Sequence, residues 1–232
     1  MSVRVNGTLI ELQRTLAHAL GPHVGVVASG VDGDVRRLYP EEAIAVARAI
    51  DRRQREFAAG RESARLAMRA IGWPEAPVPS GTDRSPQWPQ GLTGSISHTR
   101  DACLVAVASS ARVRALGLDI EMHAPIEPAL WPLICTPTEQ ENLLALPAPE
   151  RGLAVVRVFS AKEAVFKWQY PVHGQMLEFQ DVEICLLDGM NGFAACILPA
   201  LEVPSACAAR TTGRILCSPD HVVSWVITPE SN

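Results

Sequence analysis

Five prolines between residues 73 and 91 divide the chain into two regions of different character. Proline lacks the backbone N–H that helices and sheet ladders use, so neither a helix nor a central strand can continue through this segment. Before it, residues 40–72 are rich in Ala, Arg and Glu and have no proline after Pro40, which predicts one or two helices. We expect Gly60 to separate these helices and Gly72 to end the second.

Short runs typical of strands follow the proline-rich segment, with turn residues between them. A longer stretch, residues 150–170, predicts a helix that Pro171 stops. This order predicts an α+β fold, with helices on one side of antiparallel sheet. The expected strands are residues 95–98, 102–108, 113–120, 182–187, 193–198 and 222–227, the first three of them a meander, and residues 1–39 are expected to form strands and turns.

Composition and charge narrow the class of protein. A chain of 232 residues of which 47% are hydrophobic can bury a sizeable core. It has no run approaching the roughly 18 apolar residues that a membrane span requires, and its N-terminus lacks the order of a signal peptide. We therefore expect a folded cytoplasmic protein. The net charge of -4 argues against nucleic acid as a partner.

The cysteines do not form a recognisable zinc site. They are scattered, contain no CxxC pair, and have no histidine nearby at zinc-ligand spacing. We expect reduced and mostly buried thiols at Cys103, Cys135, Cys185, Cys196, Cys207 and Cys217.

The segment GLDIE, residues 117–121, places two carboxylates on one face of an expected strand. Because side chains alternate along a strand, Leu118 and Ile120 can enter the core while Asp119 and Glu121 share the opposite face. Two like charges this close need either water around both or a cation between them. Any half-buried strand with a solvated face would show the same alternation, so this segment alone leaves both interpretations open.

A second segment, FSAKEAVFK at residues 159–167, lies in the long expected helix. Glu163 and Lys167 are four residues apart and therefore neighbours on one helical face, while Phe159 and Phe166 can anchor the helix. An ordinary ion pair on an exposed helix would account for this spacing equally well.

Together, the two segments resemble the signature of the 4'-phosphopantetheinyl transferase superfamily. That pattern is approximately (I/V)G(I/V)D-x-E followed by (W/F)-S-x-KE-(A/S)-x-x-K, with Phe159 here where many members have tryptophan. The resemblance covers about residues 50–175. Within the superfamily, the chain is similar to the enterobactin-synthase-component subgroup of the Sfp type. The upstream matches are Glu56-Phe57, Gly60-Arg61, Ala64-Arg65, Ile71-Gly72, Pro86-x-Trp88-Pro89 and the run from Gly94 to His98.

The resemblance implies a reaction and a metal site. Members move the phosphopantetheine arm of coenzyme A onto a serine of an apo acyl or peptidyl carrier protein, with Mg2+, and release 3',5'-ADP. Asp119, Glu121 and Glu163 would hold the Mg2+, a hard ion that accepts oxygen ligands. Lys167 would stabilise the departing 3',5'-ADP, and Lys162 would either assist or face solvent. No charged position of the signature is substituted, which argues against an inactive relative.

The attacking serine must lose a proton, so the resemblance also implies a general base near the metal. Glu163, or a metal-bound water that it orients, is the first candidate. Glu139 is the second, because Thr136-x-Thr138-Glu139 resembles a family position, although residues 138–141 also resemble a helix cap.

Coenzyme A carries a diphosphate and a 3'-phosphate, so its site should contain several cations. Residues 48–69 are rich in arginine, although a solvated helix face would account for most of these side chains. The family match places nucleotide-contacting cations at or near three of them and uses a serine-histidine pair against the phosphates. Arg84, in the proline-rich loop, is expected to reach the 3'-phosphate. The implied coenzyme A contacts are Arg53, Arg61, Arg65, Arg84, Ser97, His98, Lys162 and Lys167.

The resemblance further implies two similar α/β halves with pseudo-two-fold symmetry and the active site between them. We expect residues 1–110 to carry the coenzyme A nucleotide contacts and residues 111–232 the metal and catalytic motifs, with the junction near residues 109–114. Such enzymes tend to be monomers, and the length and subgroup of this chain favour a role in secondary metabolism. An exposed basic or apolar patch would receive an acidic carrier protein.

Two other classes of protein would fit part of this pattern. A binding module would capture coenzyme A or a carrier without transferring anything, but the intact Asp119, Glu121, Glu163 and Lys167 argue against it. A metal-dependent phosphohydrolase would use the same carboxylates with an activated water and would need no carrier.

Overall fold

The computed structural model describes residues 7–198 and 210–230, which form two compact units. Unit 1 comprises residues 1–116 and 228–232, and unit 2 comprises residues 117–227. The boundary between the units follows Leu116. The boundary expected from the sequence, between residues 110 and 111, lies a few residues before it, in a turn. The assignment of separate binding roles to the two halves stays a prediction.

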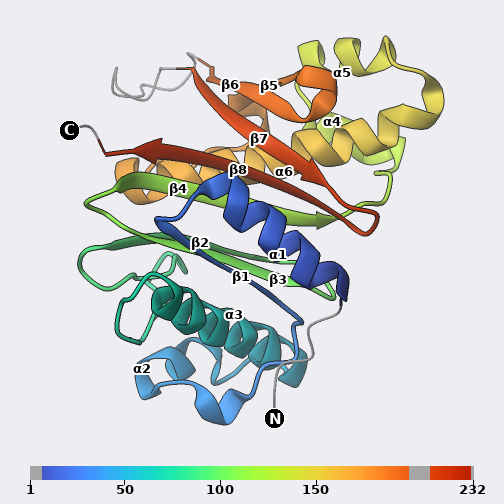
Figure 1. Ribbon diagram of the computed structural model, residues 1–232. Helices are drawn as coiled ribbons and strands as arrows, with labels where there is room; N and C mark the ends of the chain where they lie inside the picture. The colour runs from blue at the N-terminus through green and yellow to red at the C-terminus, as the bar shows by residue number, and fades with distance from the viewer. Residues whose placement is uncertain (1–6, 199–209, 231–232) are drawn as a thin grey trace. The chain divides into compact units, whose positions relative to one another are not determined.

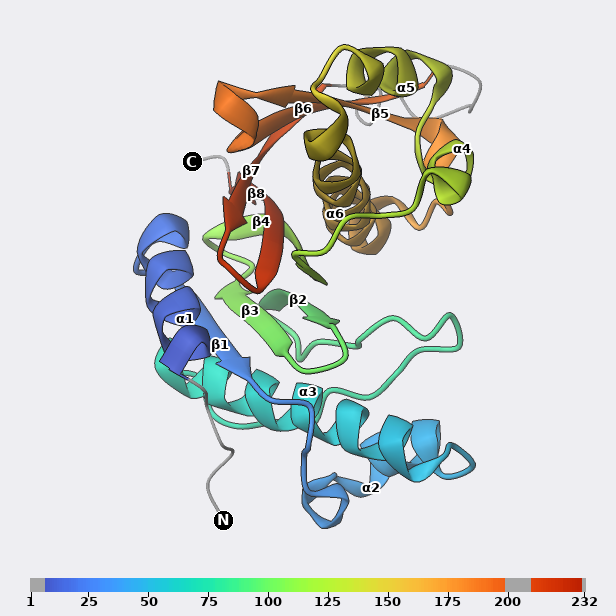
Figure 2. The same ribbon diagram turned by 90° about the vertical axis from the view of Figure 1, so that its right-hand side faces the viewer.

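Unit 1 contains a three-stranded antiparallel sheet with a long helix against it. Its strands β1 (Val24–Ser29), β3 (Cys103–Ser109) and β2 (Leu92–His98) lie in the order β1-β3-β2. Helix α3 (Asp51–Ala70) packs on β1 and β3 (Figures 1 and 2). The central strand β3 is apolar and buried from Cys103 to Ala108, because it has a strand on either side and α3 against it.

Helix α1 (Gly7–Leu20) shows that the prediction of strands and turns for residues 1–39 was wrong in its first part. Leu9, Leu12, Leu16 and Leu20 recur every three or four residues and are buried, so these short apolar runs form one helical stripe. The helix packs on β1, which is a strand of the expected kind.

The region after Pro40 is helical as expected, but Gly60 does not separate two helices. It lies inside α3, and the short helix α2 (Pro40–Ala43) precedes that helix. A Cβ on Gly60 would lie 3.2 Å from the side chain of Ile96 on β2, so close packing explains this glycine. Two 3-10 turns, η1 (Val35–Arg37) and η2 (Ile44–Val46), flank α2, and residues 73–91 are irregular apart from a bridge between Ser80 and Pro86.

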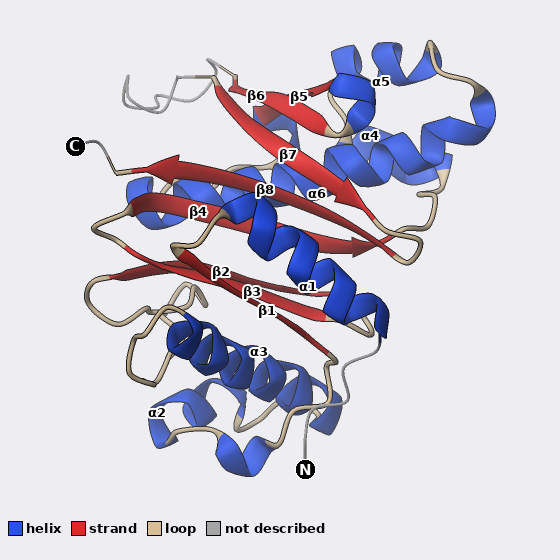
Figure 3. Cartoon of the chain, in the orientation of Figure 1, coloured by secondary structure: helices blue, strands red, loops and turns tan. Residues whose placement is uncertain are grey.

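Unit 2 carries most of a five-stranded sheet and a 26-residue helix, α6 (Ala148–His173), that packs on three of its strands. Buried Ala and Val residues of α6 form the core of this unit with Phe193 and the inner face of the sheet. Figure 3 shows the helices and the antiparallel strands of the α+β fold, which confirms the expected class. The strands, in sheet order, are β4 (Val113–Met122), β8 (His221–Pro229), β7 (Thr211–Cys217), β6 (Gly192–Ile197) and β5 (Val182–Leu187).

Three details of this half differ from the sequence prediction. Strand β7 was not expected, and β4 pairs with β8 instead of continuing a meander with β3. Pro171 lies inside α6, which instead ends before Gly174 in the left-handed conformation at φ 65°. The remaining elements are η3 (Pro128–Leu130), α4 (Trp131–Ile134), α5 (Pro137–Leu144), η4 (Phe179–Asp181) and η5 (Asp188–Met190).

The cysteines are less buried than expected. Cys103 and Cys135 are buried, but Cys185 is exposed and Cys196 and Cys217 are partly exposed, and these five are free thiols. Cys207 lies outside the described residues. Across residues 7–198 and 210–230, no helix has both the length and the apolar character needed to cross a membrane.

Candidate active site

The two segments singled out in the sequence meet within unit 2. Asp119 lies on β4, and Glu163 and Lys167 lie one turn apart on α6. The ammonium of Lys167 lies 2.6 Å from Asp119 Oδ1 and 3.8 Å from Glu163 Oε2. Because one cation contacts a carboxylate from each segment, the pair on the helix is part of a larger cluster and not an isolated surface ion pair.

A glycine allows β4 and α6 to approach this closely. A Cβ on Gly117 would collide with the backbone oxygen of Ala164 and the backbone nitrogen of Trp168. On the same strand, Leu118 and Ile120 are fully buried, as the alternation predicted. The position of Asp119 beside the helix therefore follows from the order of residues in GLDIE.

Glu121 belongs to the same electrostatic cluster. Burial raises its pKa to about 7, and the negative charges of Asp119 and Glu163 add to this effect while Lys167 opposes it. Burial also raises the pKa of Glu163. Burial would lower the pKa of Lys167, but Asp119 and Glu163 outweigh it, so the pKa of Lys167 is raised. Three carboxylates thus repel one another around the Lys167 ammonium.

The donor chemistry of this cluster fits a hard divalent cation, because Asp119, Glu121 and Glu163 all offer carboxylate oxygens. Burial is the main cause of the raised pKa values of Glu121 and Glu163 and neighbouring carboxylates add to it, and a cation bound between these groups would offset both effects. Within the part of the chain that the structure describes, however, no three His, Cys, Asp or Glu side chains are already arranged to hold a metal. In this structure the cation against Asp119 is the Lys167 ammonium.

Lys162 differs from both roles considered for it in the sequence. Its side chain is 1% exposed, so the prediction that it might face solvent is wrong. Its ammonium lies 2.7 Å from Glu139 Oε2 and donates to the backbone oxygens of Ile134 and Phe179 at 2.8 and 2.7 Å. An ammonium has three N–H groups, and these three partners satisfy them. The geometry therefore gives Lys162 no donor for coenzyme A.

Glu139 caps helix α5, as one of its two interpretations predicted. Its Oε2 accepts from the backbone N–H of Thr136, and the Thr136 hydroxyl accepts from the N–H of Glu139. The Oε1 of Glu139 accepts from the N–H of Ile184 at 2.6 Å, and its Oε2 also contacts the ammonium of Lys162. A carboxylate with these partners and 1% exposure is unsuited to take a proton from a substrate.

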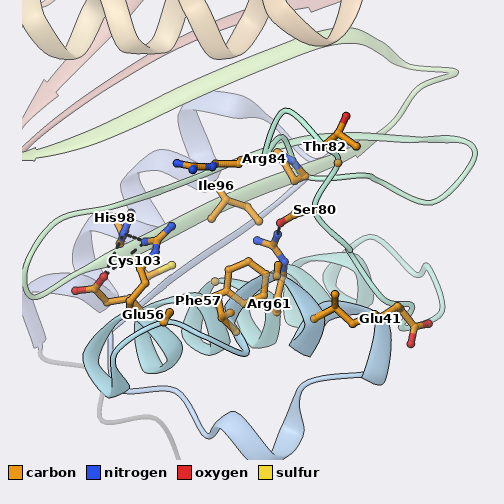
Figure 4. Close-up of a pocket in the computed structure, with 18 residues that line it drawn as sticks. Glu41, Glu56, Phe57, Arg61, Ser80, Thr82, Arg84, Ile96, His98 and Cys103 are labelled. Atoms are coloured by element: carbon orange, nitrogen blue, oxygen red, sulfur yellow. Dashed lines mark hydrogen bonds and ion pairs between the residues drawn. The ribbon is translucent and has the colours of Figure 1, made fainter.

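A cavity of about 700 Å3 lies beside helix α3 in unit 1, and Figure 4 shows its lining. Its volume is within the range of small-molecule sites, roughly 300–1,000 Å3. Cationic side chains on one part and apolar side chains on another would suit a ligand with phosphates and an apolar ring. The ionisable groups are Glu41, Arg53, Glu56, Arg61, Arg84, His98 and Cys103, and apolar lining residues include Ile44, Val46, Phe57 and Ile96.

Four of the predicted coenzyme A contacts line this cavity: Arg53, Arg61, Arg84 and His98. Arg61 is also anchored, since it donates to the backbone oxygen of Val78 at 2.6 Å. Burial lowers the pKa of Arg61 to about 10, so it remains protonated at neutral pH. Arg84 has φ 68°, in the left-handed region that residues other than glycine seldom adopt.

The other four predicted contacts do not line the cavity: Lys162 and Lys167, described above, and Arg65 and Ser97. Arg65 is buried and bound to both oxygens of Glu42 at 3.1 and 2.9 Å, which makes it part of the core of unit 1. Ser97 alternates with Ile96 and His98 along β2, so its side chain lies on the other face of the strand. Of the serine-histidine pair, only His98 lines the cavity.

Sequence reasoning missed the apolar wall of the cavity. Ile44 is 77% exposed, and the neighbouring Ala45, Val46 and Ala49 belong to the same wall. The available signal was Ile44, an apolar side chain that closely follows the charged residues Glu41 and Glu42 at the start of α2. The segment from Ser80 to Thr82 gave no signal, because a loop brings it to the cavity.

Comparisons with known proteins agree with the motifs. A family model described as the 4'-phosphopantetheinyl transferase N-terminal domain matches residues 40–108, and one described as the 4'-phosphopantetheinyl transferase superfamily matches residues 115–217. The match thus extends beyond residues 50–175, the region where the sequence motifs were recognised.

Individual relatives carry similar names. The chain is 38% identical over 168 residues to 4'-phosphopantetheinyl transferase Svp of Streptomyces mobaraensis, covering 72% of this chain and 68% of that protein. It is 33% identical over 155 residues to PptT of Mycobacterium tuberculosis, covering 66% and 67%. It is 42% identical over 122 residues to enterobactin synthase component D of Salmonella typhimurium, covering 50% and 48%.

Proposed function

The chain belongs to the 4'-phosphopantetheinyl transferase superfamily, and from this premise we propose that it moves phosphopantetheine from coenzyme A to a serine of an apo acyl or peptidyl carrier protein, with Mg2+ and release of 3',5'-ADP. The observation that carries the proposal is the contact of Lys167 with Asp119 and Glu163. It brings together, in one cluster, charged residues from both signature segments.

The proposed reaction is a phosphoryl transfer to an alcohol. The serine oxygen attacks the β-phosphorus of coenzyme A, the bond to the bridging diphosphate oxygen breaks, and 3',5'-ADP leaves with the electron pair. The serine proton must go to a base, and negative charge grows on the leaving phosphate. The chain must therefore supply a proton acceptor and cationic groups.

Glu163 is the proposed general base. Its side chain is 30% exposed and lines a pocket of about 230 Å3 with Phe166, Met176 and Leu177, so a substrate hydroxyl can reach it. Burial raises the pKa of Glu163, which brings it closer to neutral pH and makes the carboxylate a better proton acceptor. Glu139 has neither this access nor a free oxygen.

Asp119, Glu121 and Glu163 are the proposed ligands of Mg2+, which when bound would neutralise charge on the diphosphate. Lys167 is proposed to stabilise the departing 3',5'-ADP. Its ammonium is 23% exposed and already ordered by Asp119, so it can be offered to a phosphate without first being fixed in place.

The cavity of unit 1 is proposed to bind the nucleotide end of coenzyme A. Arg53, Arg84 and His98 would contact its phosphates, and Arg61 would add positive charge from a buried position. We further propose a cytoplasmic monomer that serves carrier proteins of secondary metabolism and binds neither nucleic acid nor membranes.

Mass spectrometry of a carrier protein tests the proposal. The protein is incubated with coenzyme A, Mg2+ and an apo carrier, and we expect the carrier to gain the mass of one phosphopantetheine arm. A carrier variant with alanine in place of the acceptor serine should gain nothing. Phosphopantetheine released without a carrier would indicate a phosphohydrolase, and an unchanged carrier with bound coenzyme A would indicate a binding module.

A further inference from the structure

An acidic side chain lies within the cationic cavity of unit 1. Glu56, on α3, lines the cavity together with Arg53, Arg84 and His98 (Figure 4). A carboxylate that faced a bound phosphate directly would repel it and weaken its binding. A site for an anionic ligand therefore needs a reason to contain this residue.

Both oxygens of the Glu56 carboxylate face basic side chains. Its Oε1 accepts a hydrogen bond from Arg52 Nε at 2.8 Å, and its Oε2 lies 3.6 Å from both Arg53 Nη1 and His98 Nε2. The side chain of Glu56 is 11% exposed, whereas those of Arg53 and His98 are 50% and 36% exposed. The carboxylate thus lies deeper than the two groups it contacts at the cavity.

Arg53 and His98 also contact each other, with 2.7 Å between Arg53 Nη1 and His98 Nε2. A guanidinium can only donate, so His98 accepts with this nitrogen. Arg53 is three residues before Glu56 on α3, and His98 comes from the end of β2. The dashed lines in Figure 4 include the contact between Glu56 on the helix and His98 on the strand.

Glu56 is charged at neutral pH. Burial raises its pKa, but the neighbouring Arg52, His98 and Arg53 outweigh burial and lower it. The carboxylate can therefore attract the guanidinium of Arg53, whose Nη1 also donates to His98 Nε2.

We propose that Glu56 is a positioning residue, whose carboxylate holds Arg53 in contact with His98 at the phosphate-binding end of the cavity. The proposal rests on the proposed function, because it takes the ligand to be the nucleotide end of coenzyme A. Long, half-exposed side chains lose conformational freedom when they bind a ligand, and ordering them beforehand lowers that cost. The charge of Glu56 is partly compensated by Arg52, so its repulsion of a phosphate is reduced.

Two substitutions separate the reach of Glu56 from its charge. Glu56→Asp keeps the charge and withdraws it by one methylene, whereas Glu56→Gln keeps the length and removes the charge. We expect both to weaken the binding of 3',5'-ADP, measured by calorimetry, and to raise KM for coenzyme A by roughly three- to tenfold while kcat stays within about twofold. Glu11→Gln removes a charge from the exposed side of α1 and should change neither constant.

The opposite results would overturn the inference. If Glu56 acts only by repelling phosphate, Glu56→Gln will tighten the binding of 3',5'-ADP and Glu56→Asp will leave it unchanged. Thermal unfolding of each variant is recorded as well, because weaker binding of 3',5'-ADP supports the inference only if the variant is folded at the assay temperature.

A double-mutant cycle tests whether Glu56 acts through its partners. In a protein with Arg53→Ala and His98→Ala, we expect Glu56→Gln to cause no further loss of 3',5'-ADP binding, and a full loss there would contradict positioning. Transfer to the carrier by the unsubstituted protein is measured in parallel. Failure of the proposed function would appear in that assay, and failure of this inference in the binding constants.

Discussion

Two lysines on α6 show how the partners of a side chain decide its role. Lys162 is 1% exposed and has a carboxylate and two backbone oxygens as partners, while Lys167 is 23% exposed and contacts two carboxylates. A fully paired, buried ammonium stabilises one arrangement of the surrounding elements. A partly exposed ammonium between acids can exchange its partner for a phosphate, so Lys167 is suited to chemistry and Lys162 to structure.

Removing single carboxylates of the cluster should abolish transfer. We expect Asp119→Asn and Glu163→Gln each to lower kcat/KM by roughly a hundredfold or more, since each removes a charge that the transition state needs. Carrier modification over time, followed by mass spectrometry, measures this rate. The control Glu141→Gln changes an exposed carboxylate of α5 and should be fully active. Full activity of both cluster variants would refute the proposed site.

Lys162→Met should affect stability more than coenzyme A binding. It leaves the buried carboxylate of Glu139 without its charged partner, which costs about 3–5 kcal/mol. Urea unfolding of the variant measures this loss, and adding Glu139→Gln should restore part of it. An unchanged stability with a strongly raised KM for coenzyme A would instead indicate a direct contact with the substrate.

Thiol labelling should distinguish the cysteines by burial. Burial raises the pKa values of Cys103 and Cys135 to about 12, so their thiolate forms are scarce at pH 8. Cys185 is exposed. We expect iodoacetamide at pH 8 to alkylate Cys185 in the native protein, and Cys103 and Cys135 only after denaturation. Peptide mapping locates the labels. Labelling of Cys103 in the native protein would contradict this expectation and show that the cavity lining around it becomes accessible to the reagent.

The residues that sequence reasoning misplaced have partners far along the chain. Arg65 looked like one of several helix arginines, but Glu42, which binds it, comes from another helix. Lys162 binds residues 134 and 179, which no spacing within its own helix could reveal. In contrast, Asp119, Glu163 and Lys167 were singled out because the two segments together resemble a family signature. Short periodicities then fix their positions within a strand and within a helix.

At the scale of elements, the candidate site depends on the crossing of β4 and α6. Strand alternation buries Leu118 and Ile120 on the face of β4 away from the helix and turns Asp119 toward it, and Gly117 removes the side chain that would hold the two elements apart. The long helix and most strands were predictable from their periodicity. Helix α1 was missed because the glycines after residue 20 favoured an interpretation as strands and turns for the whole N-terminal region. Strand β7 was missed because its alternation is weak.

Gly117→Ala should therefore damage both stability and activity. The new Cβ collides with backbone atoms of α6, which cannot rotate away, so β4 and the helix must separate. We expect a loss of about 1–3 kcal/mol in urea unfolding and a marked fall in carrier modification. Gly7→Ala, where nothing lies within 4 Å of the added atom, is the matched control and should be neutral. Equal behaviour of the two variants would argue against this role of Gly117.

At the scale of the whole molecule, the two groups of candidate residues belong to different units. The cavity with Arg53, Arg84 and His98 lies in unit 1, and the cluster of Asp119, Glu163 and Lys167 lies in unit 2. Each unit has its own hydrophobic core. A ligand that binds the candidate residues of only one unit should therefore affect mainly that unit.

Hydrogen–deuterium exchange should separate the two ligand sites. We expect 3',5'-ADP without metal to slow exchange mainly in the segments between residues 41 and 103 that line the cavity. We expect Mg2+ alone to slow it mainly at the end of β4 and in the middle of α6. Protection by 3',5'-ADP confined to unit 2 would contradict the assignment of the cavity.

The path of the chain through the units has a consequence for building hybrids with relatives. The chain leaves unit 1 after Leu116 and re-enters it at Thr228, and both points fall inside strands. Neither crossing offers a loop at which one parental sequence could give way to another. A chimera that exchanges unit 2 at these points would need two splices, each within a hydrogen-bonded strand pair. Keeping that pairing intact requires β4 and β8 to come whole from one parent, with the splices moved outside these strands.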